Sequence, residues 1–312
     1  MGASAPPTLE HPALIYADLD GFRRSASPFI RTGLEREEPV FAAVGAIELE
    51  ALRDDLGADT PAVLVDTREW TPHPATRLRA FHDFVTAELA RGASSIRLVG
   101  EPAWETRPAF NREWARYESA LNAVLGPFPV SLLCTYPSAR LDPAIVEDAR
   151  RTHPALLEGE VVVPSDRYAG PDELLRHWSP PLRPPPPDAI SMHGSGDLHA
   201  ARAFVTARAT AAGVAAERLD DLALATTEIL ANAVEHGGGG EPVLRTWIAD
   251  DLFVTQIEDE GIGGIPPLAG YEPPRRVLED GRGLWIARQV MDLVEIAPSP
   301  SGTAVRLSVA RS

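Results

Sequence analysis

Lysine is absent from the 312-residue sequence, and all 29 basic residues are arginine. Without lysine, the chain cannot form a Schiff base with pyridoxal phosphate or with a carbonyl substrate. It also cannot supply the lysine of a Walker A phosphate-binding loop. Enzyme classes that depend on either lysine are therefore excluded, whatever the origin of this composition.

Cysteine and long apolar runs are scarce as well. The single cysteine, Cys134, excludes internal disulfides and sites built from several cysteines, such as iron–sulfur clusters. No apolar run approaches the ~18 residues of a membrane span, and the N-terminus lacks the basic and apolar regions of a signal peptide. We therefore expect a cytoplasmic protein without a membrane segment.

Positive charge is in deficit, because 45 acidic residues against 29 arginines give a formal net charge of −16. This balance argues against direct binding of nucleic acid through its phosphates. An acidic surface is compatible with protein partners, although charge alone identifies none.

A proline-rich stretch at 180–187 divides the chain. Consecutive prolines favour an extended, semi-rigid backbone. At ~100–200 residues per domain, the length predicts two domains. We place a linker at 179–194, between an N-terminal domain at 10–178 and a C-terminal domain at 195–312.

In the N-terminal half, short apolar runs alternate with segments of helical periodicity, which predicts a parallel α/β sheet. Such a sheet binds ligands beyond the carboxyl ends of its strands. The runs are Ala13–Tyr16, Pro39–Val44, Ala62–Asp66, Ser95–Gly100, Val130–Cys134 and Val161–Val163. The side chains expected at the carboxyl ends are Tyr16, Asp66, Glu101, Cys134 and Tyr136.

The C-terminal half begins with helical segments and continues with alternating strands, which predicts an α+β sandwich. The expected helices are 198–212, 217–236 and 283–291, and the expected strands are 243–248, 252–257, 293–296 and 303–309.

Glu228, Asn232 and His236 recur every four residues and so form one row on the long predicted helix. Apolar residues occupy its buried face. A carboxylate and an amide oxygen in this arrangement can hold a hydrated Mg²⁺ or orient a nucleophile. Taken alone, such a polar row is usually just the solvated face of a helix.

Three glycine-containing motifs follow along the chain. Asp259 comes directly after a strand, where its carboxylate would suit the exocyclic amine of adenine. The helix predicted at 283–291 opens on glycines, and its free N–H groups would suit phosphates. Gly302 and Thr303 precede the last strand, where a hydroxyl could support Asp259. Each motif alone also suits an ordinary turn.

The order of these four motifs resembles the Bergerat, or GHKL, ATP-binding fold. The forms Thr-Glu-Ile-Leu-Ala-Asn-Ala-Val-Glu-His-Gly and Gly-Arg-Gly-Leu resemble the anti-sigma-factor serine/threonine kinases. The resemblance implies ATP and Mg²⁺ as cofactors, with Asn232 as the Mg²⁺ ligand, Asp259 as the adenine-binding carboxylate and Glu228 as the general base. It implies a lid at 264–280. The implied nucleotide-pocket residues are Gly261, Ile262, Gly263, Gly281, Arg282, Gly283, Leu284 and Thr303, with Arg275 and Arg276 as further cations.

This resemblance also implies partners. Kinases of this type bind a sigma factor and phosphorylate a serine on an anti-anti-sigma protein of the STAS fold, commonly as homodimers. Two alternatives stay open. The domain could act by sequestration without chemistry, or it could belong to a sensor histidine kinase. The second alternative lacks the usual helical hairpin, because the proline-rich stretch occupies its place.

Segments in the N-terminal half resemble the MEDS sensory domains, which are similar to RecA-type α/β folds. They are His11–Tyr16, Val99–Trp104, Tyr117–Asn122 and Leu132–Tyr136. The resemblance implies sensing of a small molecule or of redox state. Candidate sensory residues are His11, Tyr16, Glu101, Cys134 and Tyr136. His11 and Cys134 could share a metal or redox site, whereas a lone buried cysteine is also a common core residue.

Overall fold

The computed structural model describes most of the chain. The described residues are 9–71, 73–104, 107–177, 181–193, 197–261, 265–266, 268–274, 281–299 and 302–311. The chain folds into two compact units, the first ending at Leu175 and the second beginning at Arg176. Among the described helices, none is both long enough and apolar enough to cross a membrane.

The N-terminal unit is built on a seven-stranded sheet with the strand order β3-β2-β4-β5-β1-β6-β7. The strands are β1 Pro12–Tyr16, β2 Val40–Val44, β3 Val63–Asp66, β4 Ile96–Gly100, β5 Val130–Pro137, β6 Ala155–Glu158 and β7 Val161–Pro164. Pairing is parallel from β3 through β6, and β7 pairs antiparallel with β6. The predicted parallel α/β sheet is confirmed, because strands buried on both faces read as continuous apolar runs.

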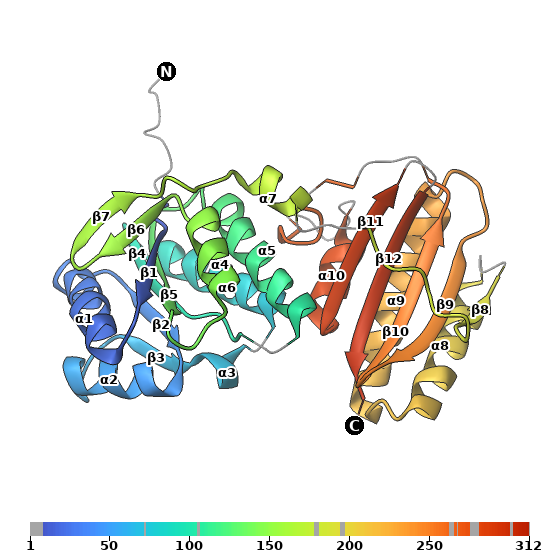
Figure 1. Ribbon diagram of the computed structural model, residues 1–312, viewed down its shortest axis with the longest axis horizontal. Helices are drawn as coiled ribbons and strands as arrows, with labels where there is room; N and C mark the ends of the chain where they lie inside the picture. Colours follow the sequence, from blue (N-terminus) through green and yellow to red (C-terminus); the bar gives the residue numbers. More distant parts are fainter. Residues whose placement is uncertain are drawn as a thin grey trace, which may run out of the picture. The chain divides into compact units, whose positions relative to one another are not determined.

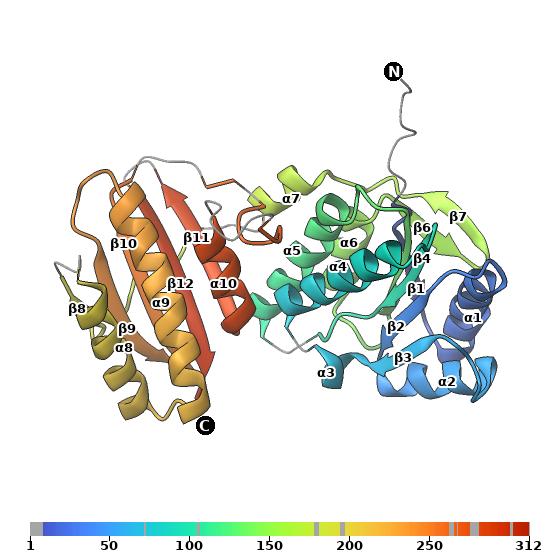
Figure 2. The same ribbon diagram turned by 180° about the vertical axis from the view of Figure 1, so that it is seen from behind.

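Helices cover both faces of this sheet, with α1 and α2 on one side and α4, α5 and α6 on the other (Figures 1 and 2). The helices are α1 Leu19–Glu35, α2 Ala46–Leu56, α3 Thr67–Trp70, α4 Pro74–Ala90, α5 Pro108–Val124, α6 Pro143–Thr152 and α7 Pro171–His177. Proline stands in the first turn of α4, α5 and α6, where its missing N–H costs no helical hydrogen bond. On the α1 and α2 side, Phe22, Ile30 and Leu52 pack into the core beneath the sheet.

The C-terminal unit holds a five-stranded antiparallel sheet with the order β11-β12-β10-β9-β8. Its elements are β8 Ile190–Met192, α8 Leu198–Ala212, α9 Ala216–His236, β9 Val243–Ala249, β10 Leu252–Asp259, α10 Arg282–Val290, β11 Leu293–Ser299 and β12 Gly302–Ala310. Helices α8, α9 and α10 cover one face (Figure 2). The core lies between them and the sheet, where Leu222, Ile229 and Leu230 meet Phe253 and Leu307. The predicted α+β sandwich is confirmed.

The described part of the predicted linker, 181–193, is not a free spacer. Its residues Ile190–Met192 form β8, the edge strand that pairs with β9. Arg306 on β12 donates a 2.7 Å hydrogen bond to the carbonyl oxygen of Arg183. The segment therefore runs over the face of the sheet opposite the helices (Figure 1). The proline content of the segment predicts an extended backbone. It does not predict that part of the segment pairs with the edge of the sheet at β9. Positions 178–180 and 194–196 lie outside the described residues.

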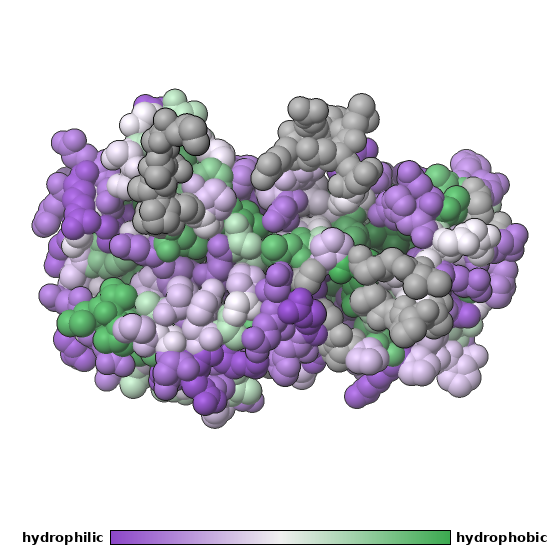
Figure 3. Space-filling view, turned by 90° about the horizontal axis from the view of Figure 1, so that it is seen from above, coloured by the Kyte–Doolittle hydropathy of each residue, from purple (hydrophilic) through white to green (hydrophobic). Residues whose placement is uncertain are grey.

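The described surface is mostly hydrophilic on the face seen in Figure 3, and apolar residues occur there in smaller groups. Val161 and Val162 on the edge strand β7 are among the exposed large apolar side chains, at 63% and 59% exposure.

Candidate functional site

The predicted row of polar side chains on α9 faces the beginning of α10. A Cβ atom placed on Gly283 would lie 2.8 Å from Asn232 Nδ2 and 3.3 Å from Glu228 Oε2. The backbone at Gly283 therefore approaches both side chains more closely than any larger residue allows. The apolar residues of α9 are buried in the core, which fixes Glu228 and Asn232 on the face toward α10. The structure thus brings together Glu228, Asn232 and Gly283, as predicted.

Asp259, at the end of β10, lies beside the C-terminal end of α9. Its Oδ1 accepts a 2.8 Å hydrogen bond from the backbone N–H of Gly261. Asp259 is paired with Thr303 across the antiparallel ladder. A Cβ on Gly302 would lie 1.8 Å from the Asp259 carbonyl oxygen, and Gly302 has φ +139°. Close backbone approach on both sides therefore fixes where the Asp259 carboxylate stands.

The N-terminus of α10 has the form expected of a phosphate site. Gly281, the N-cap residue, adopts the left-handed conformation at φ +88° and has no side chain with which to cap the first turn. Leu284 is buried in the core, so it anchors the first turn of the helix. Backbone N–H groups and the positive end of the helix dipole are then available to an anion.

Several predicted positions lie outside the described residues: Ile262, Gly263, Arg275 and Arg276, and with them positions 264, 267 and 275–280 of the predicted lid at 264–280. Within that segment, Tyr271 is buried, and the Arg288 guanidinium lies 4.1 Å from the centre of its ring. Arg282 is half-buried at the first position of α10.

At the carboxyl edge of the N-terminal sheet, Tyr16 and Glu101 lie in one polar cluster with two residues that the sequence did not single out, Glu48 and Arg140. Glu48 Oε1 accepts a 2.8 Å hydrogen bond from the Tyr16 hydroxyl and a further bond from Arg140. Glu101 accepts a 3.4 Å bond from the N–H of Gly45. Burial, assisted by the negative charge of Glu48, raises the pKa of Glu101 to about 7. Burial also raises the pKa of Tyr16, with Glu101 and Glu48 adding to the shift.

A cavity of about 1000 Å³ opens at the same edge. Its wall includes apolar side chains, such as Trp104 and Ile145, and four arginines, Arg68, Arg107, Arg112 and Arg140. Asp142 and Asp148 also line it. The predicted ligand position beyond the carboxyl ends of the strands therefore coincides with a cavity whose wall carries more arginines than aspartates.

Cys134 lies further inside the sheet than the sequence-based expectation placed it, whereas Tyr136, the last residue but one of β5, lies near the carboxyl edge, with its ring centroid 5.8 Å from that of Trp104. Strand β5 continues to Pro137, so Cys134 sits in its interior, paired with Ala13 on β1 and Gly100 on β4. The polar residues Thr135 and Tyr136 made the strand look shorter than it is. Both side chains are nonetheless buried near His11, another predicted residue.

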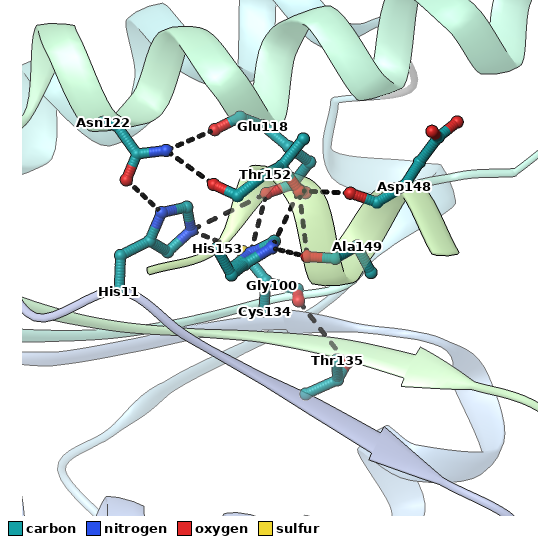
Figure 4. Close-up of polar contacts among 10 residues, drawn as sticks. All are labelled: His11, Gly100, Glu118, Asn122, Cys134, Thr135, Asp148, Ala149, Thr152 and His153. Atoms are coloured by element: carbon teal, nitrogen blue, oxygen red, sulfur yellow. Dashed lines mark hydrogen bonds and ion pairs between the residues drawn. The ribbon is translucent and has the colours of Figure 1, made fainter. Parts of the chain in front are cut away.

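His11 and Cys134 do meet, and they belong to a larger buried cluster formed by His11, Glu118, Cys134 and His153 (Figure 4). His11 Nε2 lies 3.3 Å from Cys134 Sγ, and His153 Nε2 lies 3.4 Å from Glu118 Oε2. The rings of Tyr136 and His153 are in contact, with centroids 5.6 Å apart. Burial lowers the pKa of His11, assisted by His153, and burial next to Glu118 raises the pKa of Cys134.

Family comparisons agree with this division. Residues 10–154 match the family described as "MEthanogen/methylotroph, DcmR Sensory domain", or MEDS, and residues 195–309 match the "Histidine kinase-like ATPase domain". The chain joins a MEDS sensory domain to a histidine kinase-like ATPase domain. The arginine-lined cavity and the buried cluster lie in the MEDS domain, and the Glu228–Asn232 row lies in the ATPase domain. A search of curated proteins finds no match to the chain.

Proposed function

We propose that this protein is an anti-sigma regulatory kinase under the control of its MEDS domain. In this proposal the ATPase domain binds Mg²⁺ and ATP, retains a sigma factor, and phosphorylates a serine on a STAS-fold anti-anti-sigma protein. The observation that carries the proposal is the packing of Glu228 and Asn232 against Gly283. This packing places a carboxylate and an amide beside a glycine-rich helix N-terminus.

The residues present fit a nucleotide with its metal ion. Asn232 offers an amide oxygen, a ligand type that Mg²⁺ accepts, and phosphate oxygens and water complete its coordination. The α10 N-terminus receives the phosphates, and Arg282 is the described arginine nearest in sequence to that N-terminus. The Asp259 carboxylate accepts from the adenine amine, while Thr303 on the neighbouring strand supports its position. Bound Mg²⁺ neutralises charge on the phosphates during transfer.

Glu228 serves as the general base in this proposal. It lies one helical turn before Asn232, so a serine hydroxyl presented to the phosphates would meet its carboxylate. Glu228 accepts the proton of that hydroxyl as the oxygen bonds to the γ-phosphorus and the bond to ADP breaks. Positioning and charge stabilisation supply the remainder of the rate enhancement.

Serine is favoured over a histidine in the same chain. Between 171 and 193, the helix that the structure describes is α7, Pro171–His177, which is too short to form a dimerising hairpin. His193 follows the edge strand β8, and His199 lies in the first turn of α8, so neither stands on a long exposed helix upstream of the domain.

Measurements of nucleotide binding and of sigma-factor binding distinguish the proposed kinase from a protein that only sequesters a sigma factor. Binding of ATP to the full chain, measured by calorimetry with Mg²⁺, should weaken by tenfold or more in Asn232→Ala. The exposed Glu217→Gln at the other end of α9 is the matched control and should retain wild-type affinity. Sigma-factor binding that needs neither ATP nor Asn232, together with no ATP binding by the wild type, would favour sequestration alone.

A further inference from the structure

The buried cluster in the MEDS domain draws one side chain from each of four chain segments. His11 precedes β1, Glu118 lies on α5, Cys134 lies in β5 and His153 follows α6 (Figure 4). One donor atom from each residue lies within 4.8 Å of the other three. We propose that the cluster is a binding site for one divalent zinc-type cation, held by two imidazoles, a thiolate and a carboxylate.

Hydrogen bonds fix the tautomer of both histidines. The Asn122 amide nitrogen donates to the carbonyl oxygen of Thr152 at 2.8 Å, so its Oδ1 faces His11 Nδ1 at 3.0 Å and accepts a proton from it. His153 Nδ1 lies 2.8 Å from the carbonyl oxygen of Ala149, which can only accept. Both Nδ1 atoms therefore carry the hydrogen, and both Nε2 atoms present lone pairs to the centre of the cluster.

The His11 Nε2 lone pair lies 3.3 Å from Cys134 Sγ, and both Nε2 lone pairs also lie near the acceptor oxygens of Glu118. His11 Nε2 and His153 Nε2 lie 3.7 Å and 3.4 Å from Glu118 Oε2. Neither Glu118 oxygen has a hydrogen-bond partner among the described residues, and His153 Nε2 has none either. All three side chains are at most 1% exposed. The Cys134 thiol is a weak donor within reach of His11 Nε2. The buried acceptors His153 Nε2 and Glu118, however, lack a hydrogen-bond partner in the described part of the chain, which is costly, and a cation at the centre removes that cost.

The donor set and spacing select the cation. In a tetrahedral zinc site, bond lengths of ~2.0–2.3 Å place donor atoms about 3.3–3.6 Å apart. The His11–Cys134, His153–Glu118 and His11–Glu118 separations of 3.3, 3.4 and 3.7 Å are close to this range. Thiolate and imidazole ligands favour zinc and its first-row neighbours over Mg²⁺ and Ca²⁺, which prefer oxygen. The thiol releases its proton on binding, and the thiolate and the carboxylate then balance a divalent charge. Asn122 and the Ala149 carbonyl orient the two imidazoles.

The direct test is the metal content of the full-length protein, purified without chelators and without a histidine tag. We expect one zinc per chain that survives gel filtration. After replacement with Co²⁺, we expect the strong visible absorption of tetrahedral cobalt and a thiolate-to-cobalt charge-transfer band. Because Cys134 is the sole cysteine of the chain, that band reports this site alone.

Variants separate metal binding from a structural role. Cys134→Ala should lose the charge-transfer band and weaken metal binding by 100-fold or more, while the small apolar replacement suits the core. Asn122→Ala, which leaves all four ligands in place, should weaken it by about 10–100-fold. His82→Gln, in the same domain but outside the cluster, is the control and should bind as the wild type does.

The competing occupant is a proton, with Glu118 protonated and donating to an imidazole. Wild-type protein that retains no stoichiometric zinc after incubation with the ion, and gives no thiolate-to-cobalt band, would overturn the metal site in favour of this arrangement. Equal metal affinity in Cys134→Ala and the wild type, with circular dichroism showing both folded, would also overturn it.

Discussion

Asn232 on α9 and Gly283 on α10 lie so close that a methyl group on residue 283 would stand 2.8 Å from the Asn232 Nδ2 atom. Residues 51 positions apart in sequence are thereby locked into one site. The contact leaves no room for a side chain at 283, so the position of α10 and the orientation of the Asn232 amide depend on each other.

Gly283→Ala should therefore weaken binding of Mg²⁺–ATP by about tenfold, or ~1.4 kcal/mol, because α10 or Asn232 must move. Overpacking of this kind costs about 1–3 kcal/mol of stability as well. The control is Gly213→Ala, which has a strained φ of +84° but no atom within 4 Å of the added Cβ. Calorimetric titration should show lower affinity in the first variant only. Equal ATP affinity in both would contradict the placement of the phosphate site.

Asp259→Asn should reduce ATP affinity by about 10–100-fold while leaving the fold intact. The amide can replace the carboxylate in shape, but it loses the charge that strengthens a hydrogen bond from the adenine amine. The bond from the Gly261 N–H can persist, because the remaining amide oxygen still accepts. Discrimination between ATP and GTP should fall in the same variant. Unchanged discrimination would remove Asp259 from the adenine site.

Glu101→Gln should alter how the stability of the MEDS domain depends on pH. The unfolded carboxyl has a pKa of 4.5, and the folded one has a pKa of about 7, so the folded state holds an extra proton between these values. Stability should therefore fall as pH rises from about 4.5 to about 7, by about 3 kcal/mol in total. Urea unfolding of the full chain across this range should show a flatter profile in Glu101→Gln.

The exposed Glu50→Gln, on α2 of the same domain, is the control for this titration. It should keep the wild-type slope of unfolding free energy against pH. A Glu101→Gln profile that matches both the wild type and this control would show that Glu101 ionises normally in the folded protein.

Arg306→Ala should loosen the proline-rich segment from the C-terminal sheet. Arg306 donates to the Arg183 carbonyl oxygen at 2.7 Å and to Gln256 Oε1 at 2.6 Å. Without these bonds, amide hydrogen exchange in 181–193 should accelerate by about tenfold. Arg245→Ala removes a side chain that bonds Glu258 instead, and should leave that segment protected. Equal exchange in all three proteins would show that Arg306 does not hold the segment.

Periodicity and motif order predicted most of the fold, because they are local properties of the chain. The predicted helix 198–212 coincides with α8, and Glu228, Asn232 and Gly283 converge as expected. Contacts between residues far apart in the sequence are harder to predict from it. Short strand β8 carries little pattern of its own, and its place is set by pairing with β9.

The buried cluster of the MEDS domain shows the same limit of sequence-based prediction at a candidate functional site. The sequence identifies His11 and Cys134 as candidates, but it includes Glu118 only within a family-like segment and does not single out His153. The two join the cluster through the packing of α5 and α6 over β1 and β5, which no local pattern encodes. One local signal was present: Glu118 and Asn122 lie one helical turn apart on α5, toward the same partner.

Phosphotransfer is the measurement that tests the kinase proposal most directly. The full-length protein is incubated with Mg²⁺–ATP and a STAS-fold protein encoded by a neighbouring gene, and the STAS protein is analysed by intact mass and phosphosite mapping. We predict one phosphoserine on the STAS protein, formed at least 100-fold more slowly by Glu228→Gln and at the wild-type rate by Glu217→Gln. Absence of phosphoserine with the wild type, or transfer that is insensitive to Glu228→Gln, would contradict the account.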